Sequence, residues 1–182
     1  MFAPMKFLRR FARAKDGATA IEFGLIAAPF FMIVFGMAEV AMVGLAQTNL
    51  DYAVSETGRE IRTGRAQLAG VSATDIQASV CESFGRFMAV DCDSNLHIDI
   101  RQYEAFTDIQ TAPPIVNGEL QTAGFQYEPG APSDIVVVRA YYRWHVMTPL
   151  FDRLLANANG GERLIISTMM FRNEPFEAEP TS

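Results

Sequence analysis

The chain has few of the residues on which most enzyme and metal sites depend. Its 182 residues include only two histidines, two cysteines and one tryptophan. His97 and His145 fall in different strand-like segments, each on the polar side, and the cysteines form no CxxC pair, so the spacing favours no zinc site. There is also no glycine-rich phosphate loop and no nucleophile elbow. These absences argue against catalysis, and we expect no metal and no cofactor.

Lysine is equally scarce, and its position is informative. Both lysines lie in the first fifteen residues, and every later basic residue is an arginine. Residues 1–17 hold five basic residues and one acidic residue, whereas the remainder holds 10 basic and 20 acidic residues. An acidic body does not suit nucleic acid, whose phosphates require clustered lysine and arginine. The length allows one domain plus a membrane segment.

Residues 23–46 form an apolar run in which Glu39 is the only formal charge. About 20 apolar residues are enough to cross ~30 Å of hydrocarbon, so residues 18–46 are predicted to be a transmembrane helix. Pro29 within it predicts a kink or a freed carbonyl. The basic leader, residues 1–17, predicts a cytoplasmic N-terminus and a translocated body. The run is too long for a cleaved secretory signal, and it continues directly into a patterned helix.

Two acidic residues, Glu22 and Glu39, lie in the predicted transmembrane helix. Glu22 lies where the leader meets the apolar run, and Glu39 follows 17 residues later. A carboxylate at the bilayer centre costs on the order of 2.5–3.5 kcal/mol, so intramembrane acids usually mark function. The two positions are roughly 25 Å apart along a helix and differ by about 100° around it. They are therefore not a paired proton relay, and we expect each to have its own partner, in a neighbouring subunit or at an interface.

Residues 17–23 (GATAIEF), followed by Pro29 and Glu39, resemble the N-terminal segment of TadE-like proteins. These proteins are minor pilins or pseudopilins of the bacterial tight-adherence (Tad, Flp, type IVc) pilus system, a class of type IV pilus. Pro29 and Glu39 correspond to a proline and a glutamate of the family's hydrophobic segment. The resemblance covers residues 16–44. Asp16 departs from it, because arginine or lysine is common before the glycine, and the body has no von Willebrand-type extension.

The resemblance implies a processing site. A prepilin peptidase would cut between Gly17 and Ala18 and leave Glu22 as the fifth residue of the mature chain. Glu22 and Phe23 match the family's Glu-Phe/Tyr pair. The implied partners are the prepilin peptidase, other Tad pilins or pseudopilins and inner-membrane assembly proteins. The implied location is the bacterial inner membrane, with a single span, a cytoplasmic N-terminus and a periplasmic head, and from there the pilus itself.

The expected cut has a simple chemical consequence. It creates an α-amine on Ala18, one helical turn or about 5–6 Å from Glu22, so the carboxylate can pair with this ammonium or with that of a neighbouring subunit. Because an unpaired carboxylate is penalised at low dielectric, such pairing favours one axial register between packed subunits. Ala20, Gly24 and Ala28 form a small-xxx-small spacing that permits close helix packing, although such residues are also common in any membrane span.

The helix is predicted to continue beyond the membrane, through an extension over residues 47–64. Its buried stripe is expected at spacings of four, three and four, at Leu50, Val54, Thr57 and Ile61. The whole helix is expected to run from about residue 20 to residue 63, with Gly58 and Gly64 weakening its end. A long helix with an apolar first half and an amphipathic second half that carries a small head is the pilin-like arrangement.

Residues 65–172 are predicted to form a small periplasmic α+β head with a mostly antiparallel sheet of about three or more strands. Ser72 and Asp75 resemble a capping box that opens a helix. Strand-like runs cover residues 96–101, 135–147 and 164–171. In the second run, valine, tyrosine and tryptophan alternate with arginine and histidine, which predicts one packed face and one open face, with a partner-binding surface as the alternative.

The connecting segments are predicted less specifically. Residues 104–133, rich in proline and glycine, are expected to form an excursion loop or a hairpin. A short helix is expected from Thr148 to Leu155. Residues 173–182 are expected to be a loose tail.

Cys81 and Cys92 are eleven positions apart. A translocated body lies in the oxidising periplasm, which favours a disulfide, and a loop of this length could contribute roughly 2–3 kcal/mol. Two free thiols are the alternative. Three nearby acids, Asp91, Asp93 and Asp99, are expected to form a solvated acidic loop, since their spacing matches no EF-hand.

The predicted function is that of a minor pilin or pseudopilin of a Tad pilus, a substrate of the prepilin peptidase that acts in pilus assembly and surface adherence and is not an enzyme. The alternative is an uncleaved single-span inner-membrane protein with a periplasmic binding head. A third class, a periplasmic enzyme on an anchor, lacks any catalytic triad or metal constellation in the sequence.

Overall fold

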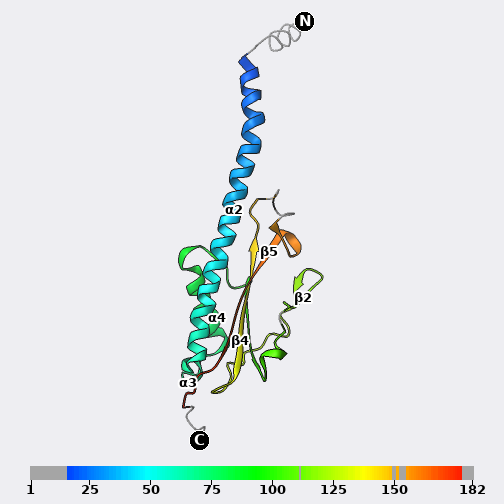
Figure 1. The fold of residues 1–182 in the computed structure, drawn as a ribbon. Coiled ribbons are helices and arrows are strands. Elements are labelled where there is room, and N and C mark those ends of the chain that lie inside the picture. The colour runs from blue at the N-terminus through cyan, green and yellow to red at the C-terminus, as the bar shows by residue number, and fades with distance from the viewer. Residues whose placement is uncertain (1–15, 111, 149–150, 152–154, 178–182) are drawn as a thin grey trace. The chain divides into compact units, whose positions relative to one another are not determined.

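The computed structural model describes residues 16–110, 112–148, 151 and 155–177. The chain divides into two compact units, Met1–Glu39 and Val40–Ser182. Helix α2 (Asp16–Arg62) supplies the described part of the first unit and continues into the second, which also holds a three-stranded sheet (Figure 1). The α+β class, with a long apolar N-terminal helix followed by a head with an antiparallel sheet, is confirmed.

Helix α2 starts four residues before the predicted position and ends one residue before it. Pro29 lies inside the helix without ending it. The end is set by Gly64, whose φ of 77° is a left-handed conformation that residues with a side chain avoid. The Gly64 N–H donates to the Ile61 carbonyl at 3.0 Å, which closes the last turn. A short helix, α3 (Arg65–Leu68), follows directly.

The sheet of the second unit consists of β1 (Leu96–Tyr103), β4 (Ile135–His145) and β5 (Glu162–Arg172) in the order β1-β4-β5. Both pairings are antiparallel, and Val138 on the central strand lies opposite Ile100 on one side and Met169 on the other. All three predicted strands are therefore present, although β1 and β5 are longer than predicted and β4 ends two residues earlier.

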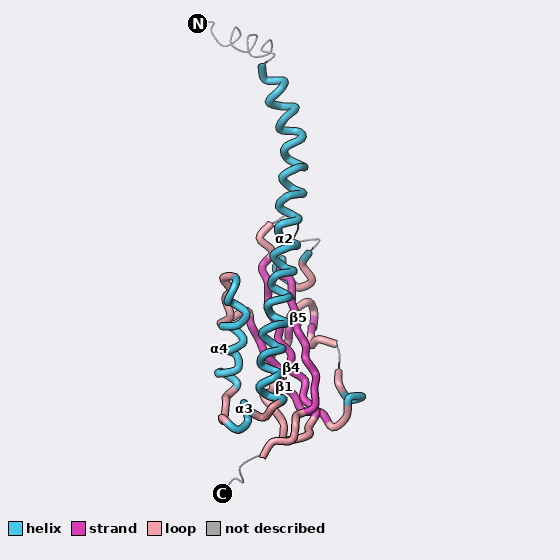
Figure 2. The backbone as a smooth tube through the Cα atoms, turned by 60° about the vertical axis from the view of Figure 1, so that its left-hand side comes forward, coloured by secondary structure: helices cyan, strands magenta, loops and turns pink. Residues whose placement is uncertain are grey.

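One face of the sheet packs against α2 and against α4 (Ala73–Phe84) (Figure 2). The predicted stripe of α2 is buried, with no member more than 3 % exposed: Leu50, Val54, Thr57 and Ile61. The sheet contributes Val136, Val138, Ala140 and Tyr142. The sequence period of α2 thus identifies its buried face correctly.

Helix α4 begins at the predicted capping box. The Asp75 N–H donates to Ser72 Oγ at 3.3 Å, and the Ser72 N–H donates to Asp75 Oδ2 at 3.0 Å, so two free amides of the first turn are satisfied. The helix then buries Ile76, Val80 and Phe84, and the ring of Phe84 meets that of Tyr142 edge-on at 4.7 Å. A 3-10 turn, η1 (Gly85–Phe87), ends it.

The second face of β4 is also buried, so the prediction of an open face is wrong. Arg139 and Tyr141 are 8 % and 0 % exposed. The ring of Phe125 stacks on Tyr141 at 5.2 Å, and the Arg139 guanidinium donates to the Gln110 carbonyl. The alternation of polar residues therefore marks a face covered by loop backbone, because carbonyl groups can accept hydrogen bonds from an arginine that solvent does not reach.

The covering segment is the predicted excursion of residues 104–133. It contains a 3-10 turn, η2 (Phe106–Asp108), and a small hairpin of β2 (Ile115–Val116) and β3 (Glu119–Leu120). The hairpin turn is Asn117-Gly118, both with positive φ, as the tightest hairpin turns require.

Residues 126–128 of this excursion then run alongside β1. The Ile100 N–H donates to the Gln126 carbonyl, and the Glu128 N–H donates to the Ile100 carbonyl, both at 2.9 Å. Asp99 is 3 % exposed and accepts hydrogen bonds from Arg101 Nε and from the Gln126 N–H at 2.8–2.9 Å. Asp99 is thus buried and holds this loop in place. The expectation that it belongs to a solvated acidic loop is wrong.

Residues 173–177, which we expected to be loose, are attached to the second unit. Asn173 is 2 % exposed, and its side-chain amide donates to the carbonyls of Pro129 and Ala131 at 2.9 and 3.0 Å. The Glu174 N–H donates to the Arg62 carbonyl at 2.8 Å, and the two side chains form an ion pair. Residues 178–182 lie outside the described part.

The helix expected from Thr148 lies mostly outside the described residues. Two backbone hydrogen bonds of it are described: the Phe151 N–H donates to the Thr148 carbonyl at 2.9 Å, and the Leu155 N–H donates to the Phe151 carbonyl at 2.8 Å. The 3-10 turn η3 (Asn159–Gly161) then leads into β5.

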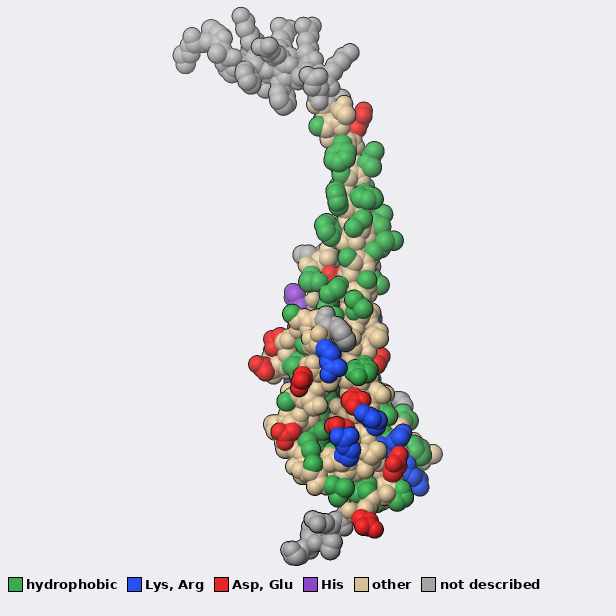
Figure 3. Space-filling model, turned by 90° about the vertical axis from the view of Figure 1, so that its left-hand side faces the viewer, with side chains coloured by type: hydrophobic (Ala, Val, Ile, Leu, Met, Phe, Trp, Pro, Cys, Tyr) green, Lys and Arg blue, Asp and Glu red, His purple; other side chains and the backbone are tan. Residues whose placement is uncertain are grey.

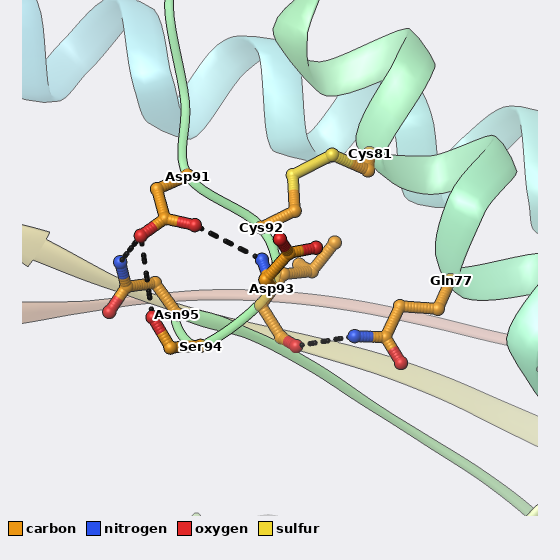
Figure 4. Close-up of a disulfide and its surroundings, with 8 residues drawn as sticks. Gln77, Cys81, Asp91, Cys92, Asp93, Ser94 and Asn95 are labelled. Atoms are coloured by element: carbon orange, nitrogen blue, oxygen red, sulfur yellow. Dashed lines mark hydrogen bonds between the residues drawn. A yellow bond between two sulfur atoms is a disulfide. The ribbon is translucent and has the colours of Figure 1, made fainter.

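Cys81 of α4 and Cys92 form a disulfide, with their Cα atoms 6.0 Å apart (Figure 4). Beside it, Asp91 organises the turn into β1 by accepting hydrogen bonds from the Asp93 N–H and from the side chains of Ser94 and Asn95. The bond therefore ties the end of α4 to the start of the sheet.

We predict that reduction of this disulfide lowers the free energy of unfolding by about 2–3 kcal/mol, because the oxidised unfolded chain is constrained by an 11-residue loop. Denaturant unfolding with and without reductant measures the difference. A Cys81→Ala/Cys92→Ala variant is the control and should not respond to reductant. Equal unfolding midpoints of the oxidised and reduced wild type would contradict the prediction.

Gly58 allows α2 to approach β5 closely. A Cβ atom built there would collide with the sulfur of Met169 and lie 3.2 Å from the Phe171 ring. We predict that Gly58→Val lowers the free energy of unfolding by about 1–3 kcal/mol through overpacking. The control is Gly44→Val on the same helix, where nothing lies within 4 Å of the added Cβ, so it should not destabilise. Similar unfolding curves for the two variants would show that the close approach is not required.

Candidate processing and assembly site

The predicted cut, between Gly17 and Ala18, falls in the first turn of α2. Gly17 is exposed, and an added Cβ would meet no atom within 4 Å. The basic leader expected to precede the cut lies, apart from Asp16 and Gly17, outside the described residues.

Glu22 and Phe23 are both exposed, Phe23 to 70 %. Glu22 stands four residues after Ala18, which is one turn further along the same helix. No other described residue forms a hydrogen bond or an ion pair with the Glu22 carboxylate. The carboxylate is therefore available to an amine at the helix start or to a group on another molecule.

The part of α2 that follows Glu22 presents apolar side chains outward (Figure 3). Leu25 and Ile26 are each 71 % exposed. Helix α2 is long and apolar enough to cross a membrane, by length and composition. Such a surface is stable only when lipid or a partner helix covers it. Ala20, Gly24 and Ala28 are all exposed on it, so the small-xxx-small positions are accessible.

Glu39 differs from Glu22 in environment. It is the last residue of the first unit and is 3 % exposed. It takes part in an interaction within the chain. The structure keeps Glu22 and Glu39 apart on the helix and does not bring them into one site.

Three cavities in the second unit were compared as binding sites. One of about 480 Å³ lies between the β2–β3 hairpin and the start of β5, and its lining includes Glu119, Glu162 and Arg143. Another of about 240 Å³ lies over the ion pair of Asp99 and Arg101. A third of about 500 Å³ is lined by residues of α4 and by both cysteines of the disulfide. No histidine is among the linings of these three cavities.

The two histidines are not brought together. His97 is half-buried against the Phe125 ring, and burial, then the charge of Arg143, lowers its pKa. His145 is exposed at the end of β4. Within the described ranges, no three histidine, cysteine, aspartate or glutamate side chains gather in a way that could hold a metal ion.

Comparison with known proteins gives a match for the N-terminal segment. Residues 17–59 match the family described as TadE-like protein. The match begins at Gly17, includes Glu22, Pro29 and Glu39, and extends through most of the buried stripe of α2. No curated protein and no solved structure gives a match. Residues 17–59 of the chain are therefore similar to the TadE-like family, and this similarity suggests a protein associated with the Tad pilus.

Proposed function

We propose that the protein is a minor pilin or pseudopilin of a Tad pilus. A prepilin peptidase cuts it between Gly17 and Ala18, and the mature chain takes part in pilus assembly and surface adherence. In this proposal the protein is a bitopic inner-membrane protein whose N-terminus is cytoplasmic and whose head is periplasmic. Its role is structural, and its partners are the peptidase, other Tad pilins and the inner-membrane assembly proteins.

The observation that carries the proposal is the match of residues 17–59 to the TadE-like family, because it begins at the expected cut. Glu22, which is exposed and pairs with no described residue, lies one turn after that cut and supports the proposal. Cleavage turns Ala18 into a new cationic terminus at the N-terminal end of α2. The Glu22 carboxylate and this Ala18 ammonium attract one another strongly, because the dielectric constant of a membrane is low and a helix N-terminus favours an anion. The pair can therefore fix the axial position of one subunit against the next.

The disulfide also fits a periplasmic head, since such bonds persist in oxidising compartments. The proposed orientation is supported by the five basic residues that precede the membrane-length segment, because cytoplasmic flanks are enriched in lysine and arginine. The tight packing of the head on α2 suits a subunit that is assembled as one piece.

The proposed function predicts a cut between Gly17 and Ala18. The protein extracted from membranes of cells that contain the Tad system should begin at Ala18, and Gly17→Val should leave the leader intact, because a β-branched side chain blocks the cut position. Gly24→Val, seven residues later on the same helix, is the control and should be processed normally. N-terminal sequencing and intact mass distinguish the products. An intact leader in the wild type would favour an uncleaved single-span protein with a periplasmic binding head.

The proposed function also predicts a role of Glu22 in assembly. Glu22→Gln keeps the shape of the side chain and removes its charge, so it should insert and be processed but be recovered with other pilus components about tenfold less, as expected for a lost charge-assisted hydrogen bond of about 1.5–3 kcal/mol. Asp51→Asn, an exposed acid on the same helix, is the control. Quantitative co-purification from membranes measures the effect. Unchanged recovery of Glu22→Gln would remove the assembly role from Glu22.

A further inference from the structure

The outer edge of β5 has backbone hydrogen-bonding groups directed away from the sheet at its even-numbered residues. Val146, at the end of β4, donates to the carbonyl of Gly161, which places the odd-numbered residues of this segment toward β4. The Glu162 carbonyl accepts from the amides of Asn157 and Ala158, on the side away from β4. The N–H and C=O groups of residues 162, 164, 166, 168, 170 and 172 therefore point outward.

The first half of this edge is already paired. The Asn157 side chain accepts from the Leu164 N–H at 2.6 Å and donates to the Leu164 carbonyl at 3.4 Å, as a neighbouring strand would. The Ile166 carbonyl accepts from Gln47 of α2 at 3.1 Å. Two amide side chains thus close the edge as far as residue 166.

The edge is open over three residues between two contacts with α2, because the next outward residue, Glu174, donates its N–H to the Arg62 carbonyl at 2.8 Å. No described residue donates to or accepts from the outward backbone groups of Thr168, Met170 and Arg172. The side chains of these three residues are exposed, Met170 to 50 %. We call the outward backbone of these three residues the free edge. The opposite edge of the sheet, β1, is not open at Ile100, because residues 126–128 pair with it there.

An unpaired edge strand is a ready template for another strand, and proteins usually protect it with lysine, proline or a bulge. The free edge has none of these, and Arg172 at its end is its only charged residue. We propose that the free edge of β5 binds an extended strand of a second, different polypeptide by β-augmentation.

A second copy of this chain is a poor occupant of the free edge, if both copies sit in one membrane as the proposed function requires. Strand β5 runs in the same direction as α2, because Gln47 meets Ile166 and Arg62 meets Glu174. Antiparallel pairing of two β5 strands would therefore make the two α2 helices run in opposite directions. The two chains would then enter their heads, at Val40, from opposite ends of the pair.

Parallel pairing of two copies fails for a different reason. In a parallel ladder, an outward residue of one strand lies opposite an inward residue of the other. A two-fold axis along the strands places each residue opposite itself, so the outward groups cannot bond in that pattern. A head-to-tail contact with β1 of another copy meets an edge that residues 126–128 already occupy at Ile100.

The free edge also indicates the side chains of its partner. Met170 and Arg172 lie on the same side of the strand, and no described acid forms an ion pair with Arg172. An apolar residue opposite Met170 and an acidic residue beside Arg172 would complement them. The expected partner is therefore an extended segment with alternating side chains and an acid near one end.

Photo-crosslinking tests the proposal in membranes of cells that produce the full chain and the Tad components. Benzoylphenylalanine at position 168 should give an adduct that contains an extended, alternating peptide of a different protein. Met170→Pro removes one outward N–H that β4 does not use, so it should lower the adduct yield about tenfold, whereas Met170→Ala should not. Benzoylphenylalanine at Tyr52, exposed on α2, should not give this adduct.

Three results would overturn the proposal: no adduct from position 168, an adduct made only of this chain's own peptides, or an equal yield with Met170→Pro. Hydrogen exchange supplies a second measurement if Met170→Pro does not fold. The amides of Thr168, Met170 and Arg172 should exchange about tenfold more slowly in these membranes than in the purified protein in detergent, and equal rates would also contradict the proposal. The intact mass of the same sample reports cleavage after Gly17 separately, so a failure of the free edge and a failure of the proposed processing can be told apart.

Discussion

The fold of the second unit depends on the contact between the last third of α2 and the inner face of the sheet. Leu50, Val54 and Ile61 lie at most 1 % exposed in this contact. Burial of each such side chain contributes about 1.5–3 kcal/mol, so the contact is a large share of what holds the head together. It is possible only because Gly58 has no side chain where Met169 and Phe171 press against the helix. The helix that forms the membrane-length segment is therefore also the main core element of the head.

The sequence was a good guide wherever local chemistry decides the structure. The period of the α2 stripe, the capping box at Ser72, the helix end near Gly64 and the three strand segments are all found where local patterns indicate them. Each of these depends on residues close in the chain, and such preferences survive in almost any tertiary setting.

The expectations that failed depend on distant partners. Alternating arginines on β4 suggested a solvated face, but Arg139 is satisfied by the carbonyl of Gln110, 29 residues away. Asp99 was grouped with a surface loop because its acid neighbours are near in sequence, yet it bonds the backbone of Gln126. The composition of residues 173–182 predicted a loose tail, yet Asn173 is buried and donates hydrogen bonds to the carbonyls of Pro129 and Ala131. In all three cases a loop without regular structure supplies the partner, and no local pattern encodes that pairing. The candidate site shows the same division, since the Gly17–Phe23 motif is local, whereas the burial of Glu39 could not be read from its apolar surroundings.

The parallel course of α2 and β5 has a mechanical consequence. A pull on the chain at Val40 enters the head along the direction in which helix and strand lie against each other. The bonds along the contact, from Gln47–Ile166 to Arg62–Glu174, are then loaded together in shear and not broken one at a time from an end. The bond between the Glu174 amide and the Arg62 carbonyl fastens the far end of this contact. A head built in this way resists extraction of its own helix.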